Sequence, residues 1–153
     1  SRTMGDIFIL RHENGRYLAS KLRKIGGIEP LKEDSRITKR GYYLFVMRYH
    51  AEEFSGLQRD RFIEALQAEG VPAGKMYAMP LYRQPAFKKE RLEGIIPTQN
   101  LAQDYEHLYL PACEKHFEQE VILEHQVLLT DKESLDSIAA SVEKIKQNID
   151  DIL

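Results

Sequence analysis

Apolar residues recur at helical spacing near both ends of this chain. Residues 6–25 place them three or four apart and stop at Gly26 and Gly27, so we predict a helix without an evident N-cap. A second helix follows Thr130, which we predict to be its N-cap in a capping box with Glu133. The apolar stripe of that last helix comprises Leu135, Ile138, Val142, Ile145, Ile149 and Ile152. We expect the stripe to pack against a sheet or a partner.

The middle of the chain alternates between strand-like and helical patterns. Residues 41–49 and 121–129 are dense in β-branched, aromatic and aliphatic side chains, which indicates buried strands. Residues 58–69 have the period of an amphipathic helix, and residues 104–119 predict another that Pro111 either begins or kinks.

The order of these elements predicts the class of fold. Helices and strands alternate without internal repeats, so we predict an α+β domain with a small antiparallel or mixed sheet packed against helices. Residues 28–40 are polar and irregular, and residues 88–103 are charged, poorly patterned and expected to be mobile.

A proline-rich loop, residues 70–87, separates two of the predicted helices. Its three prolines each remove a backbone donor and favour extended geometry before them, so this loop cannot be a helix. Tyr77 and Tyr82 have hydroxyls for a polar ligand, and Arg83 has a forked guanidinium for an anionic one. The alternatives are a surface loop whose tyrosines cover the edge of the core and a surface salt bridge for Arg83.

Composition limits the classes of protein that this chain can belong to. Its 153 residues suit one domain, and 22 basic against 24 acidic residues argue against nucleic-acid or membrane-surface partners. We find no apolar run of membrane-spanning length and no signal peptide. Cys113 is the only cysteine, which excludes an internal disulfide and favours a reducing compartment, so we predict a cytoplasmic protein.

Few residues form recognisable chemical motifs. The five histidines lack the spacing of metal ligands, so we predict no metal site. Cys113 and His116 share a helical face, which leaves a cysteine nucleophile as one hypothesis and a structural cysteine as the other. His125 interrupts the predicted strand 121–129, so we expect it either to line a cleft or to bond a nearby backbone carbonyl.

Four blocks of sequence resemble the C-terminal part of the DegT/DnrJ/EryC1/StrS sugar aminotransferases, which are fold-type I enzymes dependent on pyridoxal phosphate (PLP). In order, the blocks are NGRYLASKLRKIGGIEP, YYLFVMRY followed by RDRFIEALQAEGVPAG, YAMPLYRQPAF, and LPACEKHFEQEVILEHQVLLTDKESLDSI. The chain departs from the family at one position. The family often has a proline immediately before the histidine that corresponds to His125, and this chain has Glu124 there.

The resemblance implies a division of the chain and a cofactor elsewhere. Residues 1–27 would be the helix that leads into the small domain and residues 28–153 the small domain itself, with the large PLP-binding domain absent. No lysine here matches the family's cofactor lysine, so this chain alone is expected neither to bind PLP nor to act as an enzyme.

The resemblance also implies substrates, partners and site residues. Tyr77, Tyr82, Arg83 and His125 would contact the amino donor or the sugar or cyclitol substrate of the full enzyme, which is expected to be a homodimer. There are two alternatives to a C-terminal aminotransferase domain. One is a standalone binding or assembly module with this fold, and the other is an independent enzyme that uses Cys113 and His116.

The missing cofactor lysine generates a spectroscopic prediction. When the 153-residue chain is mixed with PLP, we expect neither transamination nor the absorbance band of an internal aldimine, because no lysine is placed to form it. An aldimine band that borohydride or a single Lys→Ala change abolishes would contradict this prediction.

Overall fold

The computed structural model describes residues 3–92, 95 and 104–152 of the chain. In chain order, the helices and strands are α1 (Met4–Ile25), β1 (Ile28–Pro30), β2 (Leu44–Tyr49), α2 (Arg59–Ala68), β3 (Ala73–Gly74), α3 (Lys89–Leu92), α4 (Pro111–Gln119), β4 (Glu120–Glu124) and α5 (Lys132–Gln147). The short 3-10 turns are η1 (Ala51–Phe54), η2 (Leu81–Arg83), η3 (Pro85–Phe87), η5 (His125–Leu129) and η6 (Ile149–Asp151).

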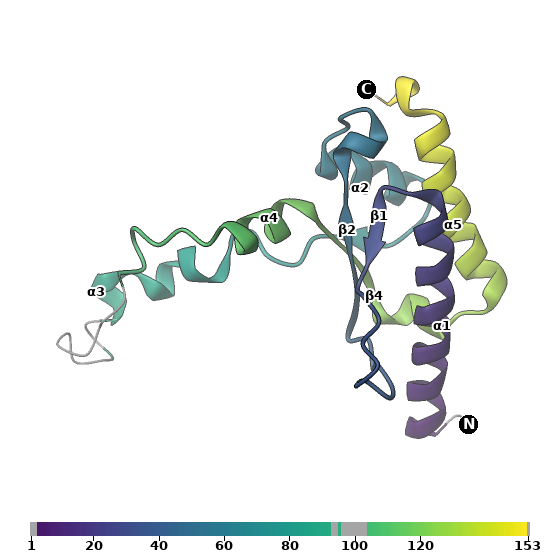
Figure 1. The fold of residues 1–153 in the computed structure, drawn as a ribbon, viewed down its shortest axis with the longest axis horizontal. Helices are drawn as coiled ribbons and strands as arrows, with labels where there is room; N and C mark the ends of the chain where they lie inside the picture. The colour runs from purple at the N-terminus through teal and green to yellow at the C-terminus, as the bar shows by residue number, and fades with distance from the viewer. Residues whose placement is uncertain (1–2, 93–94, 96–103, 153) are drawn as a thin grey trace. The chain divides into compact units, whose positions relative to one another are not determined.

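The chain divides into two compact units. Unit 1 comprises residues 1–76 and 119–153, and unit 2 comprises residues 77–118. Unit 1 contains an antiparallel sheet with the strand order β1-β2-β4-β3, beside which α1 and α5 lie next to each other (Figure 1). The predicted α+β class is confirmed, and its sheet is antiparallel.

One face of the sheet forms the core of unit 1. In β2, Phe45, Met47 and Tyr49 are buried and alternate with more exposed residues, as the period of a strand requires. From β4, Val121 and Leu123 point to the same buried face. The helices cover this face with apolar side chains that include Leu18, Leu22, Phe62, Leu66, Leu135, Val142 and Ile145.

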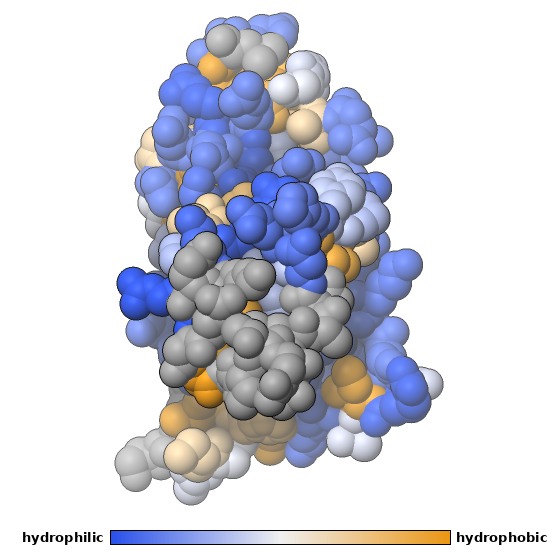
Figure 2. Space-filling model, turned by 90° about the vertical axis from the view of Figure 1, so that its left-hand side faces the viewer, coloured by the Kyte–Doolittle hydropathy of each residue, from blue (hydrophilic) through white to orange (hydrophobic). Residues whose placement is uncertain are grey.

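The stripe of α5 therefore packs in the core of unit 1, not on its surface. Leu135, Val142 and Ile145 are buried, and Ile138 is half-buried against the core. The last two residues of the predicted stripe, Ile149 and Ile152, also contact the core but lie beyond the end of α5. On the face that Figure 2 presents, hydrophilic residues prevail and apolar residues are scattered. In the part of the chain that the structure describes, no helix is long and apolar enough to cross a membrane.

The ends of the two long helices correct two details of the sequence prediction. α1 does have a cap: the Thr3 hydroxyl accepts from the backbone N–H of Asp6, and the Asp6 carboxylate accepts from that of Thr3, a capping box. For α5 the predicted N-cap Thr130 is wrong by one residue. Asp131 caps it by accepting from the N–H of Ser134 at 2.9 Å, and the Thr130 hydroxyl donates instead to the Val127 carbonyl.

The strand expected over residues 121–129 is also shorter than predicted. β4 ends at Glu124, which lies opposite Leu44, the first residue of β2, so no neighbouring strand continues beyond this point. The chain then turns into η5, and His125 is its first residue. The strand expected over 41–49 likewise begins only at Leu44, and residues 28–30, expected to be irregular, form the strand β1.

Three of the remaining expectations are confirmed. The helix predicted over 58–69 is α2, Pro111 begins α4, and residues 70–87 contain no α-helix. The helix predicted to start at residue 104 begins only at Pro111. Most of the segment expected to be mobile, residues 88–103, lies outside the described residues.

A buried amide joins α1 to the start of α5. Asn14 is 2% exposed, and its side-chain nitrogen donates to the carbonyls of Leu128 and Thr130, both at 2.9 Å. Its side-chain oxygen accepts from Lys132 Nζ at 2.8 Å. All the polar atoms of this side chain are thereby satisfied, which a buried amide requires.

The next turns of the two helices continue this contact. Tyr17 donates its hydroxyl hydrogen to Asp136 at 2.8 Å, and Lys21 pairs with the same carboxylate at 3.0 Å. Lys146 then donates to the carbonyl of Ile25 at 3.1 Å, near the end of α1. Because successive residues of α1 meet successive residues of α5, the two helices run in the same direction (Figure 1).

A tyrosine in a left-handed conformation packs against the same helix. Tyr42 has a φ of 47°, which costs a residue with a side chain about 1–2 kcal/mol. Its ring lies over Gly15, where an added Cβ would overlap the ring carbons. It also stacks on Phe45, with 5.8 Å between the ring centroids. The glycine in the middle of α1 is thus explained by the ring that it admits.

We expect Asn14→Ala to lower the free energy of unfolding by about 2–3 kcal/mol, because it leaves the buried Leu128 carbonyl and the part-buried Thr130 carbonyl without this donor. Urea unfolding of the 153-residue chain, followed by circular dichroism, measures this change. The control is Asn148→Ala, since the Asn148 side chain donates to the Lys144 carbonyl on the surface. We expect the control to stay within about 0.5 kcal/mol of the original chain. Equal effects of the two changes would contradict the role given to Asn14.

Candidate functional site

Proline and short turns shape the loop of unit 2 that bears the predicted site residues. Pro80 precedes η2, and the N–H of Arg83 donates back to its carbonyl at 3.0 Å. Pro85 occupies the first turn of η3, where a missing N–H costs nothing. These consecutive turns fix the backbone at Tyr82 and Arg83.

A buried carboxylate holds both of these side chains. Glu114 of α4 is 8% exposed, and it accepts a hydrogen bond from the Tyr82 hydroxyl and pairs with Arg83 Nη2 at 2.9 Å. The pKa of the Arg83 guanidinium is raised, first by its hydrogen bond with Tyr82 and further by the charge of Glu114. Tyr82 is itself only 7% exposed, so its hydroxyl is used within unit 2.

The same residues form one side of a pocket in unit 2. The pocket has a volume of about 330 Å³, and its lining residues are Tyr82, Arg83, Gln84, Phe87, Lys88, Tyr105, Glu106 and Leu108. The rings of Phe87 and Tyr105 lie 5.3 Å apart and form an aromatic wall. Two cations and one carboxylate among these residues suit a ligand with an anionic group.

The other two predicted site residues are not among the lining residues of this pocket. Tyr77 belongs to unit 2, is 59% exposed and does not line the pocket. His125 belongs to unit 1, where its ring stacks with that of Tyr43 at a centroid distance of 6.4 Å. Tyr43 is 81% exposed and immediately precedes β2. The structure therefore brings Tyr82 and Arg83 together, and it gives His125 an aromatic neighbour.

Sequence reasoning missed Glu114, the residue that positions Tyr82 and Arg83. In the sequence it is one of many acidic residues on an amphipathic helix, and nothing local indicates that it is buried. The aromatic wall of Phe87 and Tyr105 was also missed, because its two rings come from separate parts of unit 2.

Other chemical hypotheses gain no support from the geometry. Cys113 and His116 are both half-buried on α4, and the hypothesis of a cysteine nucleophile stays a prediction. Among the described residues, no group of three or more histidine, cysteine or acidic side chains could hold a metal ion.

The lysines of the described chain do not fit a PLP site. Lys21 and Lys146 are half-buried, and the other lysines with described side chains are exposed. Lys21 pairs with Asp136, whose hydrogen bond raises the pKa of this ammonium group, the opposite of what a Schiff-base nucleophile needs. Lys146 is held by backbone carbonyls at the end of α1. We therefore derive no chemical step that uses PLP from these residues.

The architecture of the chain occurs in a known class of enzymes. The crystal structure of 3-amino-5-hydroxybenzoic acid synthase matches with a TM-score of 0.68 at 22% sequence identity. The match covers 92% of this chain and 34% of the synthase chain. At this identity the likeness shows the fold, which is that of a part of a larger enzyme.

Sequence comparison then gives the family. Residues 5–143 match the DegT/DnrJ/EryC1/StrS aminotransferase family, and this chain belongs to it. The resemblance noted in the sequence is thereby confirmed over nearly the whole chain. It corresponds to a partial domain of that family, consistent with the C-terminal domain, and the hypothesis of a standalone module is not favoured.

Three curated relatives agree with this family. All are provisionally named L-glutamine:3-amino-2,3-dideoxy-scyllo-inosose aminotransferase. The protein from Streptoalloteichus tenebrarius is 32% identical over 92% of this chain and 35% of its own length. The proteins from Micromonospora echinospora and Streptomyces kanamyceticus are 31% and 28% identical, each over 86% of this chain and about a third of their own length. This chain thus spans about a third of the relatives that it matches.

We expect Glu114→Ala to loosen unit 2, because it leaves the buried Tyr82 hydroxyl without an acceptor, a loss of about 1–3 kcal/mol. Limited proteolysis should then cleave residues 77–118 faster than in the original chain. The matched control is Glu118→Ala, one turn further along α4, where the side chain is exposed. If both variants are cleaved at the original rate, Glu114 does not hold this region together.

Proposed function

We propose that this chain is the small-domain part of a PLP-dependent aminotransferase that transfers an amino group from L-glutamine to a keto-cyclitol or keto-sugar. The observation that carries the proposal is the family match over residues 5–143, together with relatives whose names specify this donor and a cyclitol. We further propose that residues 1–27 lead into the small domain and that residues 28–153 form it.

In this proposal, the chemistry on the cofactor belongs to another part of the enzyme. PLP, when bound there, supplies the electron sink for amino transfer. The residues of this chain bind and orient the substrates, and they exclude water from one side of the cleft. This division agrees with lysines that are exposed or engaged in ion pairs and carbonyl contacts.

Arg83 is the strongest candidate for a substrate contact. Half of its side chain is exposed, although it is paired with the buried Glu114. Its guanidinium has five N–H donors, so the contacts with Glu114 and Tyr82 leave others for a carboxylate, which it can bind through two parallel hydrogen bonds. We assign it the carboxylate of the amino donor.

The other predicted contacts have different roles in the proposal. The Tyr82 ring lines the pocket while its hydroxyl fixes Glu114, so Tyr82 positions Arg83. The exposed phenol of Tyr77 and the imidazole of His125 offer hydrogen bonds to the hydroxyl groups of a sugar or cyclitol. We propose that the complete enzyme is a cytoplasmic homodimer, without nucleic-acid or membrane partners.

The test uses the complete product of the gene that encodes this chain, assayed with L-glutamine and a keto-cyclitol. We expect Arg83→Ala to raise the KM for L-glutamine about 10–100-fold with little change in kcat, since a charge-assisted hydrogen bond used equally in the ground and transition states is lost. The KM for the ketone should stay the same.

Arg61→Ala is the control, because Arg61 is an exposed residue of α2 whose contacts, with the Glu64 carboxylate and the Ile152 carbonyl, lie at the surface. An unchanged KM for L-glutamine in Arg83→Ala would contradict the proposal that Arg83 binds the carboxylate of the amino donor. Failure of the complete protein to aminate any sugar or cyclitol ketone would overturn the proposed activity itself.

A further inference from the structure

A polar pocket of about 420 Å³ lies in unit 1 between α1 and the segment that joins β1 to β2. We call it the arginine pocket, after Arg16, Arg23 and Arg40 in its lining. Its volume lies within the range of about 300–1,000 Å³ that is typical of small-molecule sites. All of its lining residues fall between positions 12 and 42, so it is separate from the pocket of unit 2 that the proposed function uses.

The two walls of the arginine pocket are tied together by hydrogen bonds. His12, Arg16 and Arg23 are spaced by four and seven residues and therefore share one face of α1. The opposite wall, residues 31–42, attaches to this face where the backbone N–H of Arg40 donates to His12 Nδ1 at 3.1 Å. Arg23 Nη2 donates to the carbonyl of Leu31 at 2.9 Å. The wall is thus held at both of its ends.

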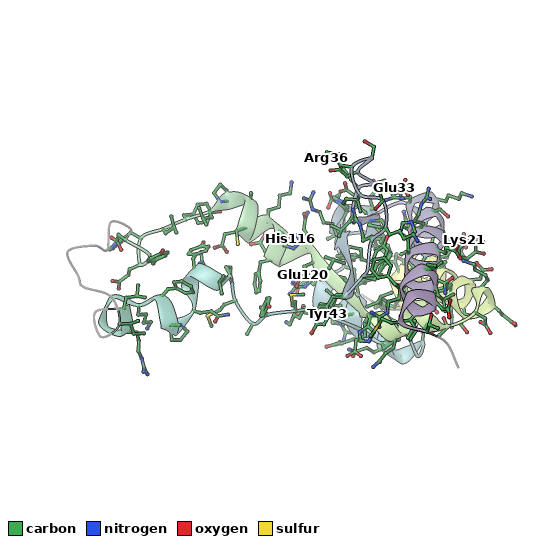
Figure 3. All side chains as sticks on the ribbon, turned by 90° about the horizontal axis from the view of Figure 1, so that it is seen from below. Lys21, Glu33, Arg36, Tyr43, His116 and Glu120 are labelled. Carbon is green, nitrogen blue, oxygen red and sulfur yellow. The ribbon has the colours of Figure 1, made fainter. Side chains whose placement is uncertain are left out.

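Positive charge exceeds negative charge in this pocket. Of the two carboxylates in its lining, Glu33 pairs with Arg16 at 3.2 Å and Asp34 pairs at 2.6 Å with Arg36, outside the lining. Figure 3 shows Glu33 and Arg36 on the segment beside α1. Within the described part of the chain, Arg23 and Arg40 form no salt bridge. Among the described residues, Arg23 and Arg40 are therefore not ion-paired, although the charge of Arg40, after the hydrogen bonds from Arg36, also lowers the pKa of the Asp34 carboxyl.

The Tyr42 ring contributes a rigid apolar surface to the arginine pocket. Its position is fixed by the left-handed backbone and by the fit over Gly15, and Arg40 lies over the ring with 5.8 Å from Cζ to the centroid. Burial raises the pKa of the Tyr42 hydroxyl and the charge of Glu33 raises it further, whereas the charges of Arg40, Arg23 and Arg16 lower it, so all three guanidinium groups act on the phenol. Residues in strained conformations cluster at ligand sites.

We propose that the arginine pocket binds a small phosphate monoester, with the phosphate on Arg23 and Arg40 and its organic group against Tyr42. Two guanidinium groups match the charge of a phosphate dianion, and their planar forks match its oxygens. Arg23 and Arg40 each spend one side-chain N–H on a backbone carbonyl in the described part of the chain, so further donors remain for the ligand. The volume leaves room for a sugar-sized group beside the phosphate.

Isothermal titration calorimetry of the complete, PLP-loaded gene product tests this proposal. The probes are glucose 6-phosphate, inorganic phosphate and malonate, titrated at one fixed ionic strength. Since PLP occupies its own phosphate site, phosphate binding reports on other sites. We expect glucose 6-phosphate to bind most tightly and malonate at least about 10-fold more weakly, because a dicarboxylate lacks the tetrahedral arrangement of oxygens.

Three variants locate the binding. Arg23→Gln should weaken glucose 6-phosphate about 10-fold or more, and Arg40→Lys, which keeps the charge but loses the fork, should weaken it about 3–10-fold. The matched control is Arg61→Gln, which removes the same charge from the exposed surface of α2 and should bind as the original protein does. Circular dichroism melts establish whether each variant is folded. If Arg23→Gln does not fold, the binding measured with Arg40→Lys decides the result.

Each other outcome overturns the proposal. These outcomes are the absence of glucose 6-phosphate binding, equal binding of malonate, and loss of binding in Arg61→Gln to the same extent as in the pocket variants. The KM for L-glutamine, which depends on Arg83 in the proposed function, should not change in Arg23→Gln. The binding of glucose 6-phosphate therefore tests the arginine pocket, and the KM for L-glutamine tests the proposed function, so each proposal can fail independently of the other.

Discussion

The arrangement of unit 1 depends on the buried amide of Asn14. Because this side chain binds the carbonyls of Leu128 and Thr130 as well as Lys132, it fixes where α5 begins relative to the middle of α1. The apolar stripe of α5 then meets the core in a single register. A shift by one residue would leave the buried amide and the buried Leu128 carbonyl without partners, so the polar contact selects among packings that the apolar side chains alone would tolerate.

The same contact determines the path of the chain after β4. The strand cannot continue past Glu124, since β2 begins opposite it, and η5 must bring residues 128 and 130 to Asn14 within a few positions. His125 is therefore the first residue of a turn at the end of the internal strand β4, beside Tyr43. Its exposure to a ligand in the proposed function follows from where the strand pairing stops.

The repeat of apolar residues along the sequence predicts those helices and strands that are long enough to contain a visible repeat. The helices α2 and α5 and the central strand β2 each bury one side, and that side is visible as a repeat in the sequence. β1 is not visible, because three residues carry no period and Ile28 becomes part of a strand only by pairing with Tyr49. The turn at His125 was missed for a related reason, since the residues 125–129 are apolar enough for a strand but lack a partner.

The candidate site shows the same limit. Residue type alone made Tyr82 and Arg83 candidates, because a phenol and a guanidinium can bind polar and anionic ligands, and it left a surface role open for both. Their common partner Glu114 lies 32 residues after Tyr82, and its burial exists only in the folded unit. The family resemblance, in contrast, was visible from sequence because it depends on the order of four blocks and not on any contact.

Gly15 and Tyr42 form a pair whose members cannot change independently. Any side chain at position 15 displaces the Tyr42 ring, and the ring is what balances the left-handed backbone at its own position. A smaller residue at position 42 would free the space over α1 but would also remove a wall of the arginine pocket. Replacing Gly15 with a better helix former therefore requires a rebuilt connection between β1 and β2 as well. This coupling makes the pair a useful position at which to redesign the domain.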